Sequence, residues 1–402
     1  MFYIVALGIW MAIHLYVGHR IITPMGLDLL PKLAAWFLVL SSYVMVPLIF
    51  SLRLGSPKPF WYVPLFWITF VMFGYVTTIF PLLMTKDVVM WSWTKMGTYS
   101  TLNSQQGSVG APDEKHRQRQ ANHHMNMGIM AITLALVLMG IYKAGVAPQV
   151  KIVETPVEGL DKRLDGLRIA LISDIHISPT VHGDTVGDIV RRVNELAPDI
   201  VAHTGDLADA TVEEMGKDAE PLAGLKAKYG VFFVTGNHEY YWDLKGWLKV
   251  VENTGAVALN NEHRLVEFNG ARLLVAGITD YSAGASAPGH KSDPVKALAG
   301  APERNFTLML AHQPRSVVAV AATGQVDLQL SGHTHGGQYF PWNIIVRFVH
   351  PVAPGLSRYE GMWVYLTRGS VYWGPPLRLG SPKEITLIVL KRAEKMVSAE
   401  GS

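Results

Sequence analysis

Four long runs of apolar residues lie in roughly the first third of the chain. A helix needs about 20 apolar residues to cross the hydrocarbon core of a bilayer. The runs cover residues 2–17, 33–52, 61–84 and 125–142. The first run lacks a basic start and three more follow it, so we interpret it as an anchor rather than a cleavable signal peptide. The pattern predicts a transmembrane region of about four helices over residues 1–145.

The pattern changes at about residue 151 to short β-type runs, with amphipathic stretches in several of the gaps. The β-type runs are residues 168–173, 200–204, 231–235, 272–278, 306–311, 328–331, 362–367 and 384–390, and residues 185–198 and 243–255 have helical periodicity. Strands that alternate with helices favour a layered α/β domain. We place this domain at residues 150–395.

Composition agrees with a chain that is part membrane and part globular. Of its 402 residues, 49% are hydrophobic and only 17% are charged, and the apolar excess lies in the first third. The formal net charge of +3 is too small to argue for nucleic acid as a partner. The chain has no cysteine, which excludes disulfides and thiolate metal ligands.

Basic residues beside the apolar runs predict the orientation, because Lys and Arg concentrate on the cytoplasmic side. Arg20, Lys32 and the basic loop between the third and fourth runs would then lie in the cytoplasm, with everything after Tyr142 outside. Arg53 and Lys58 argue for the opposite orientation.

Polar residues that can bind metal ions follow five of the predicted strands. In chain order they are Asp174 and His176, then Asp206 and Asp209, then Asn237, His238 and Glu239, then His312, and finally His333 and His335. Ligands bind at the carboxyl ends of strands in α/β sheets. Any one of these segments alone is typical of a surface loop or turn. Five at the same topological place indicate a common site.

These segments carry a family resemblance. The motifs Asp-x-His, Gly-Asp-x-x-Asp, Gly-Asn-His-Glu, a single His and Gly-His-Thr-His, in this order, resemble those of the calcineurin-like metallophosphoesterases over about residues 167–390. The ending resembles the bacterial branch that is tethered to membranes or exported. The resemblance implies a four-layer αββα sandwich and two divalent metal ions (Mn, Zn, Fe or Co). Taken with the four apolar runs and the basic residues beside them, we expect a multi-pass protein of a bacterial inner membrane, with a periplasmic catalytic domain.

The resemblance also assigns roles to individual residues. One metal would take Asp174, His176 and His335, the other would take Asn237, His312 and His333, and Asp206 would bridge both. We expect His333 and His335 to lie on an extended loop, so that both side chains point the same way. His238 would be the general acid, held by Asp209. Arg368 or Arg378 could bind a phosphate oxygen, although a salt bridge fits either arginine equally well.

The function implied is a membrane-anchored dimetal phosphoesterase, in which a metal-bridging hydroxide attacks a phosphate ester or diester. The segment 338–356 after the metal histidines is apolar and aromatic. We expect its Phe340, Trp342 and Phe348 to face the membrane, and the substrate to be amphipathic, such as a lipid or lipid-linked phosphate. A buried strand or a loop that covers the core is the alternative for this segment.

Three other functions fit parts of the sequence. A pyrophosphatase of a UDP-linked acylated sugar, as in lipid A precursor synthesis, would need the domain to face the cytoplasm. A metal-bound sensing module without turnover is disfavoured, because the candidate acid and its Asp partner are both present. A transporter is disfavoured because the apolar runs hold few ionisable groups at mid-depth.

Overall fold

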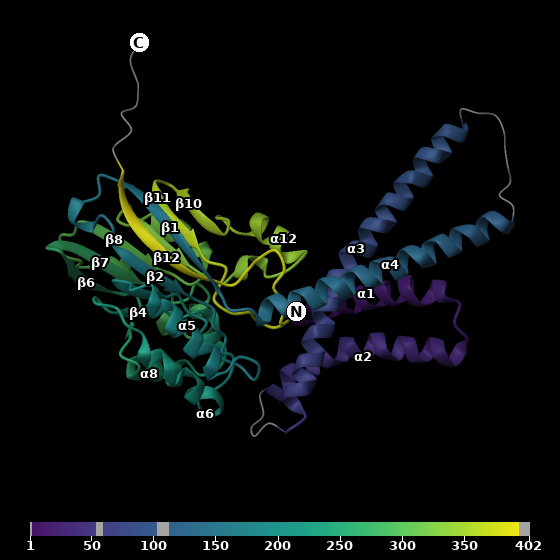
Figure 1. Ribbon diagram of the computed structural model, residues 1–402, viewed down its shortest axis with the longest axis horizontal. Coiled ribbons are helices and arrows are strands. Elements are labelled where there is room, and N and C mark those ends of the chain that lie inside the picture. The colour runs from purple at the N-terminus through teal and green to yellow at the C-terminus, as the bar shows by residue number, and fades with distance from the viewer. Residues whose placement is uncertain (1, 54–58, 103–111, 394–402) are drawn as a thin grey trace, which may run out of the picture. The chain divides into compact units, whose positions relative to one another are not determined.

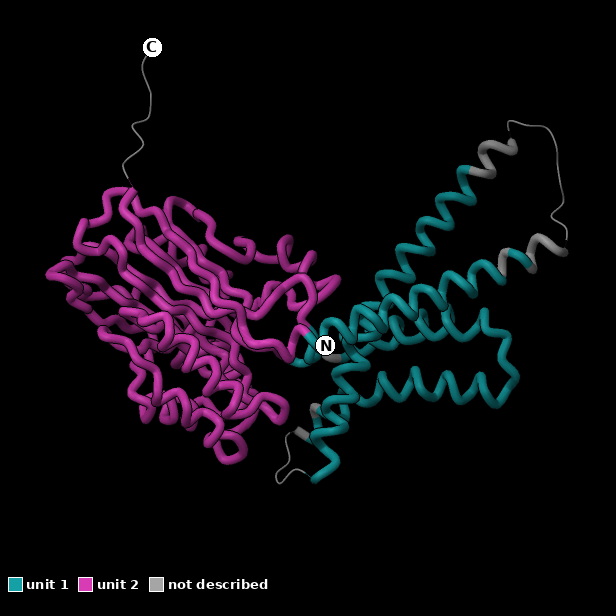
Figure 2. The backbone as a smooth tube through the Cα atoms, viewed as in Figure 1, with its two compact units in different colours: residues 1–142, 374–377 teal, residues 143–373, 378–402 magenta. Residues whose placement is uncertain are grey.

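The structure, a computed structural model, describes residues 2–53, 59–102 and 112–393, which form two compact units (Figure 2). Unit 1 comprises residues 1–142 and 374–377, and unit 2 comprises residues 143–373 and 378–402. Lys58, which bears on the predicted orientation, and the last two residues of the predicted range 150–395 lie outside the described residues.

Unit 1 contains four long helices, α1 (Phe2–Ile22), α2 (Leu29–Arg53), α3 (Tyr62–Leu102) and α4 (Pro112–Gly145), with the short 3₁₀ turn η1 (Thr23–Met25) after α1 (Figure 1). Each of the four contains a stretch long and apolar enough to cross a membrane, which confirms the predicted helical region. Helix α3 has 41 residues. At about 1.5 Å per residue it is roughly twice as long as the hydrocarbon core is thick, about 30 Å, so part of it extends beyond the apolar layer.

Small apolar clusters join the helices of unit 1. Val17 of α1 packs with Ile79 and Leu83 of α3, and Ile129 of α4 contacts the same cluster. His14, in the middle of α1, is buried, and its Nε2 lies 3.0 Å from Ser42 Oγ on α2. Because the apolar side chains on the outside of such a bundle face lipid, a few interhelical contacts of this kind are enough to fix the packing.

Unit 2 contains two six-stranded sheets. The first has the order β1-β12-β2-β3-β4-β5 and the second has the order β10-β11-β9-β8-β7-β6. The strands are β1 (Gln149–Glu158), β2 (Arg168–Ile172), β3 (Ile200–His203), β4 (Val231–Phe233), β5 (Val257–Ala258), β6 (Glu262–Phe268), β7 (Ala271–Gly277), β8 (Phe306–Leu310), β9 (Leu328–Ser331), β10 (Gly355–Tyr359), β11 (Met362–Leu366) and β12 (Glu384–Ala393). Strands β2 to β5 are parallel, as are β7, β8, β9 and β11.

Helices of different lengths connect the strands of unit 2. They are α5 (Gly183–Glu195), α6 (Val212–Met215), α7 (Asn237–Tyr241), α8 (Leu244–Asn253), α9 (Ala283–Ser286), α10 (Pro294–Leu298), α11 (Val317–Ala321) and α12 (Trp342–Val349). One apolar core lies between the sheets, a second joins the first sheet to α5 and α8, and a third joins the second sheet to α10 and α11. The αββα sandwich is therefore confirmed.

The eight predicted strands are all present, whereas β1, β5, β6 and β10 were not predicted. Strand β1 lies at the edge of its sheet and alternates between exposed and buried residues. Strand β6 is also an edge strand and carries Glu262, Arg264 and Glu267 on its exposed positions. Edge strands with one solvated face lack the continuous apolar run that marks a central strand, so the sequence signal for them is weak.

Candidate metal centre

The five polar segments meet because the strands before them are parallel and end at the same edge. Segments that follow β2, β3 and β4 come from the first sheet, and those that follow β8 and β9 come from the second. The seven proposed ligands are Asp174, His176, Asp206, Asn237, His312, His333 and His335, and all except His333 are buried. Backbone hydrogen bonds join the loops, with the amides of Asp174 and His176 donating to the carbonyls of Gly205 and Asp206.

Backbone strain is concentrated at this edge. Among the described residues, ten other than glycine have a positive φ, and five of them are proposed ligands: Asp174, His176, Asp206, His333 and His335. Such conformations cost about 1–3 kcal/mol each and persist where the surrounding structure enforces them. Gly205, at φ +93°, abuts the backbone of Gly236, which a side chain at this position would prevent. The strain therefore holds the ligand side chains in place at a cost to stability.

The first cluster consists of Asp174, His176 and His335. The Nε2 atoms of His176 and His335 face each other at 3.0 Å, and Asp174 Oδ1 lies 3.6 Å from His335 Nε2. These ligand atoms all lie within 4.8 Å of one another. Two ring nitrogens and a carboxylate oxygen that converge in this way form a donor set suited to a divalent transition metal.

The second cluster consists of Asp206, His312 and His333, with Asn237 beside it on the loop after β4. His312 Nε2 lies 3.1 Å from Asp206 Oδ2 and 3.2 Å from His333 Nδ1. Asn237 Oδ1 is buried and has no hydrogen-bond partner among the described residues. An orphaned buried carbonyl oxygen is costly unless it binds something, so this amide fits the metal ligand that the motif predicts.

Hydrogen bonds to the second ring nitrogen fix the orientation of two of the imidazoles. His312 Nδ1 donates to the carbonyl of Thr204 at 2.7 Å, which leaves Nε2 free as a ligand. His176 Nδ1 lies 3.1 Å from Asp209 Oδ1. Contacts of this kind set the ring orientation of metal-bound histidines and tune metal affinity. The chain's own residues therefore fit two adjacent metal ions.

Comparison with known proteins agrees with this geometry. Residues 167–337 match the model of the calcineurin-like phosphoesterase family. An uncharacterized metallophosphoesterase of Helicobacter pylori is 34% identical over 275 residues, which cover 68% of this chain and 72% of that protein. The chain belongs to the calcineurin-like phosphoesterase family.

Other relatives are longer. A zebrafish (Danio rerio) transmembrane protein with a metallophosphoesterase domain is 43% identical over 66% of this chain and 62% of its own length. The match thus spans about three fifths of that relative. Among solved structures, the NAD nucleotidase of Haemophilus influenzae aligns over 51% of this chain and 45% of its own, with 18% identity and a TM-score of 0.37. Four membrane-length helices and relatives named as transmembrane proteins mark this phosphoesterase as a membrane protein.

His238 lies next to the proposed metal ligands. Its Nδ1 makes a short hydrogen bond to Asp209 Oδ1, and its Nε2 lies 3.9 Å from Asp206 Oδ2. Burial alone would lower the pKa of His238, but the carboxylates of Asp206 and Asp209 outweigh burial and raise this pKa to about 9. The two carboxylates therefore favour the protonated ring, which presents Nε2 toward the site.

Glu239 joins two of the ligand loops. Its carboxylate accepts hydrogen bonds from the amides of Leu207 at 2.7 Å, Gly236 at 2.6 Å and Asp206 at 3.1 Å. Burial and the nearby charge of Asp206 raise the pKa of Glu239 to about 7. Its side chain points at the backbone and not at the ligand atoms, which gives it a positioning role.

The loop with His333 and His335 is not extended, so that expectation is wrong. His333 and His335 have φ of 72° and 51°, and Thr334 between them is right-handed helical. Thr334 Oγ1 accepts from the amide of Gly336 at 3.2 Å and stabilises this tight turn. The turn closes within a few residues of the end of β9. The left-handed backbone at each histidine directs its side chain to its own cluster.

The two arginines expected at the substrate lie in the loop after β11. Arg378 is 1% exposed and sits behind His335, where Nη1 donates to the carbonyls of His335 at 3.0 Å and Arg368 at 2.8 Å. Arg368 is partly exposed, and its Nη1 forms an ion pair with Glu384 at 3.0 Å. We therefore propose a positioning role for Arg378, and keep only Arg368 as a proposed phosphate contact.

Trp373 was not predicted from the sequence as a residue of the site. Its ring centroid lies 5.5 Å from that of His238 and 6.5 Å from that of His176, and its backbone is held by the side-chain amide of Gln338. The position of Trp373 after a strand could have indicated it. Strand β11 is parallel to its neighbour β9, so the loop after β11 lies at the same edge of the sheet as the loop with His333 and His335. An aromatic residue in that loop can line the site.

Proposed function

We propose that the chain is a membrane-anchored dimetal phosphoesterase that hydrolyses a phosphate ester or diester. The observation that carries this proposal is the pair of adjacent ligand clusters, with Asp206 of the second lying 3.8 Å from His176 of the first and the orphaned Asn237 Oδ1 beside them. When bound, two divalent ions would lower the pKa of a water molecule and neutralise the charge of the phosphate. Mn, Zn, Fe and Co all suit these mixed oxygen and imidazole ligands.

The chain's own residues supply the proton for the leaving group. As the bond from phosphorus to the leaving oxygen breaks, His238 Nε2 gives its proton to that oxygen, and a water-derived oxygen takes its place on phosphorus. Asp209 holds His238 through Nδ1, so Nε2 is the atom that points into the site. Trp373 packs against the same ring and limits its movement.

Metal removal tests the proposal directly. Purified full-length chain is expected to hold two divalent ions per chain by elemental analysis. Chelation should abolish hydrolysis of bis(p-nitrophenyl) phosphate, and Mn²⁺ or Zn²⁺ should restore it. Full activity in protein without bound metal would overturn the proposal.

We further propose that the substrate is a lipid or lipid-linked phosphate. Support comes from α12, which begins seven residues after His335 and has an apolar face open to solvent. Phe348 is 84% exposed, and Trp342, Ile344, Ile345 and Val349 are also exposed. Among the alternatives for this segment, a buried strand does not fit this exposure. An exposed apolar patch marks a contact surface, and in a membrane-anchored chain the bilayer is the surface at hand.

Two details add to this assignment. His350, at the end of α12, has its ring centroid 6.3 Å from that of His333, so the helix lies beside the second cluster. Only residues 146–148 separate the end of α4 from β1, so the linker between the membrane helices and the sheets is short. Aromatic side chains favour the membrane interface, where α12 would insert Trp342 and Phe348, with the partly buried Phe340 nearby.

A double substitution tests the role of α12. Trp342→Ser with Phe348→Ser should leave turnover of a soluble nitrophenyl ester intact, but lower turnover of phospholipid in vesicles about tenfold or more, because roughly 1.5–3 kcal/mol of apolar burial per large side chain is lost. The matched control is Val295→Ser with Val318→Ser, which changes two exposed apolar residues on α10 and α11. Equal losses on both substrates, together with a lower melting temperature, would make α12 part of the core instead.

The orientation remains part of the proposal. We place unit 2 outside the cytoplasm, on the basic residues near the ends of α1, α3 and α4. A topology reporter fused after Ser402 decides this point, because a cytoplasmic signal would favour the nucleotide-linked acyl sugar as substrate.

A further inference from the structure

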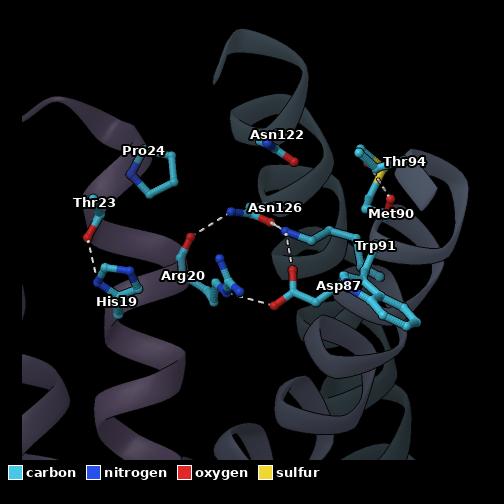
Figure 3. A pocket seen from close by; sticks show the side chains of 11 residues that line it. His19, Arg20, Thr23, Pro24, Asp87, Met90, Trp91, Thr94, Asn122 and Asn126 are labelled. Atoms are coloured by element: carbon cyan, nitrogen blue, oxygen red, sulfur yellow. Dashed lines mark hydrogen bonds and ion pairs between the residues drawn. The ribbon is translucent and has the colours of Figure 1, made fainter. Parts of the chain in front are cut away.

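A polar pocket lies within unit 1, where α1, α3 and α4 meet (Figure 3). Its volume is about 300 Å³, at the lower end of the range of ligand sites, about 300–1,000 Å³. The lining includes Arg20, Lys86, Asp87, Asn122 and Asn126. Ionisable residues inside a membrane region are costly and usually mark a function, yet none of these residues belongs to the metal centre.

Asp87 is the residue of the pocket that pairs with both cations. Its carboxylate forms ion pairs with Arg20 Nε at 2.6 Å and Lys86 Nζ at 3.2 Å, and it accepts a hydrogen bond from the hydroxyl of Tyr16 at 2.6 Å. Asn126 accepts from Lys86 at 2.7 Å and donates to the carbonyl of Arg20 at 2.6 Å. Two cations and a hydroxyl offset the charge of Asp87. Figure 3 shows Arg20 between Asp87 and Asn126, which hold it at the pocket.

The network leaves an excess of positive charge. The pocket has two cationic side chains, Arg20 and Lys86, against the single carboxylate of Asp87. The side chain of Arg20 is 43% exposed and forms its ion pair with Asp87 through Nε. An accessible guanidinium of this kind is suited to bind phosphate oxygens.

The depth of the pocket matches that of lipid headgroups. Arg20 lies near the end of the apolar span Ile4–Met25, and Asn122 and Asn126 lie near the start of the span Gln120–Gly145. Trp91, also in the lining, is 65% exposed, as expected for an aromatic residue at the membrane interface. Basic pockets between membrane helices bind anionic headgroups.

We propose that this pocket binds the phosphate of an anionic phospholipid. The guanidinium of Arg20 and the ammonium of Lys86 contact the phosphate oxygens, and Asn122 bonds the polar part of the headgroup. The excess positive charge selects lipids with a net negative charge over zwitterionic ones. The inference is independent of the hydrolytic activity, because no residue of the pocket belongs to the metal centre.

Lipid titrations on the purified full-length chain in phosphatidylcholine nanodiscs test this inference. Native mass spectrometry should show one tightly retained phosphatidylglycerol per chain, with weaker retention of phosphatidylcholine. Arg20→Gln should weaken phosphatidylglycerol binding about fivefold or more, the effect of one basic residue near an anionic surface. The matched control is Lys95→Gln, an exposed lysine of α3 outside the pocket lining, which should change binding less than about twofold.

A second variant covers the case in which Arg20→Gln fails to fold. Asn122→Phe fills the pocket without changing its charge and should lower phosphatidylglycerol binding to the same extent. Equal retention of both lipids by the wild type, equal losses in Arg20→Gln and Lys95→Gln, or unchanged binding in Asn122→Phe would overturn the inference. Inorganic phosphate that binds as tightly as the lipid would also overturn it. Asp206→Asn should keep the lipid, so failure of the hydrolase proposal would leave this test intact.

Discussion

Asp206→Asn is expected to remove nearly all turnover and to lower the metal content. Its carboxylate is the group that reaches both clusters, with Oδ2 lying 3.1 Å from His312 Nε2 and 3.8 Å from His176 Nε2. A neutral amide removes a negative charge that both cations need. Metal ions contribute several kcal/mol to catalysis at about 1.36 kcal/mol per tenfold in rate, so turnover should fall on the order of 10³-fold or more.

The measurement is turnover of a nitrophenyl phosphodiester together with elemental analysis of the same sample. Asn matches Asp in shape, and its carbonyl can still accept from the amide of His238, as Asp206 Oδ1 does at 2.9 Å. Asp184→Asn, at an exposed position on α5, is the matched control. If Asp206→Asn kept two metals and wild-type turnover, the shared ligand would have to be another residue.

His238→Ala is expected to separate proton transfer from metal binding. Turnover of an ester with an alkyl leaving group should fall about 10²–10⁴-fold, because that oxygen needs a proton as it leaves. The loss should be much smaller for nitrophenolate, which leaves unprotonated. Metal content should stay at the wild-type value.

This last readout is needed because His238 also forms a cluster with His176 and Asp206 that could hold a metal ion. Loss of metal in His238→Ala would make the residue a ligand, and equal losses with both leaving groups would make it structural. His182→Ala, at an exposed histidine, is the matched control. Asp209 would be a less informative target, since the same Oδ1 contacts both His176 and His238.

Some features of the chain follow from the order of its residues alone. Apolar runs of membrane length predict the four helices, because the bilayer sets the length that a helix must have. Central strands such as β2, β3 and β8 are buried on both faces, so their apolar runs are visible in one dimension. The convergence of the proposed ligands could also be predicted, because parallel strands bring their carboxyl ends to one edge and each proposed ligand lies within four residues of a strand end.

Other features depend on contacts between distant residues and were decided only by the tertiary structure. Arg378 was expected at the substrate, but its guanidinium is enclosed by backbone carbonyls and His335, which sequence spacing does not show. The segment after His335 could be a buried strand or a surface helix by composition, and the exposure of Phe348 distinguishes them. Arg20 and Asp87 lie 67 positions apart, on α1 and α3. Their ion pair forms because the packing of the two helices brings one turn of each together. The amino-acid sequence determines which residues lie on a helix, but not which helix packs against it.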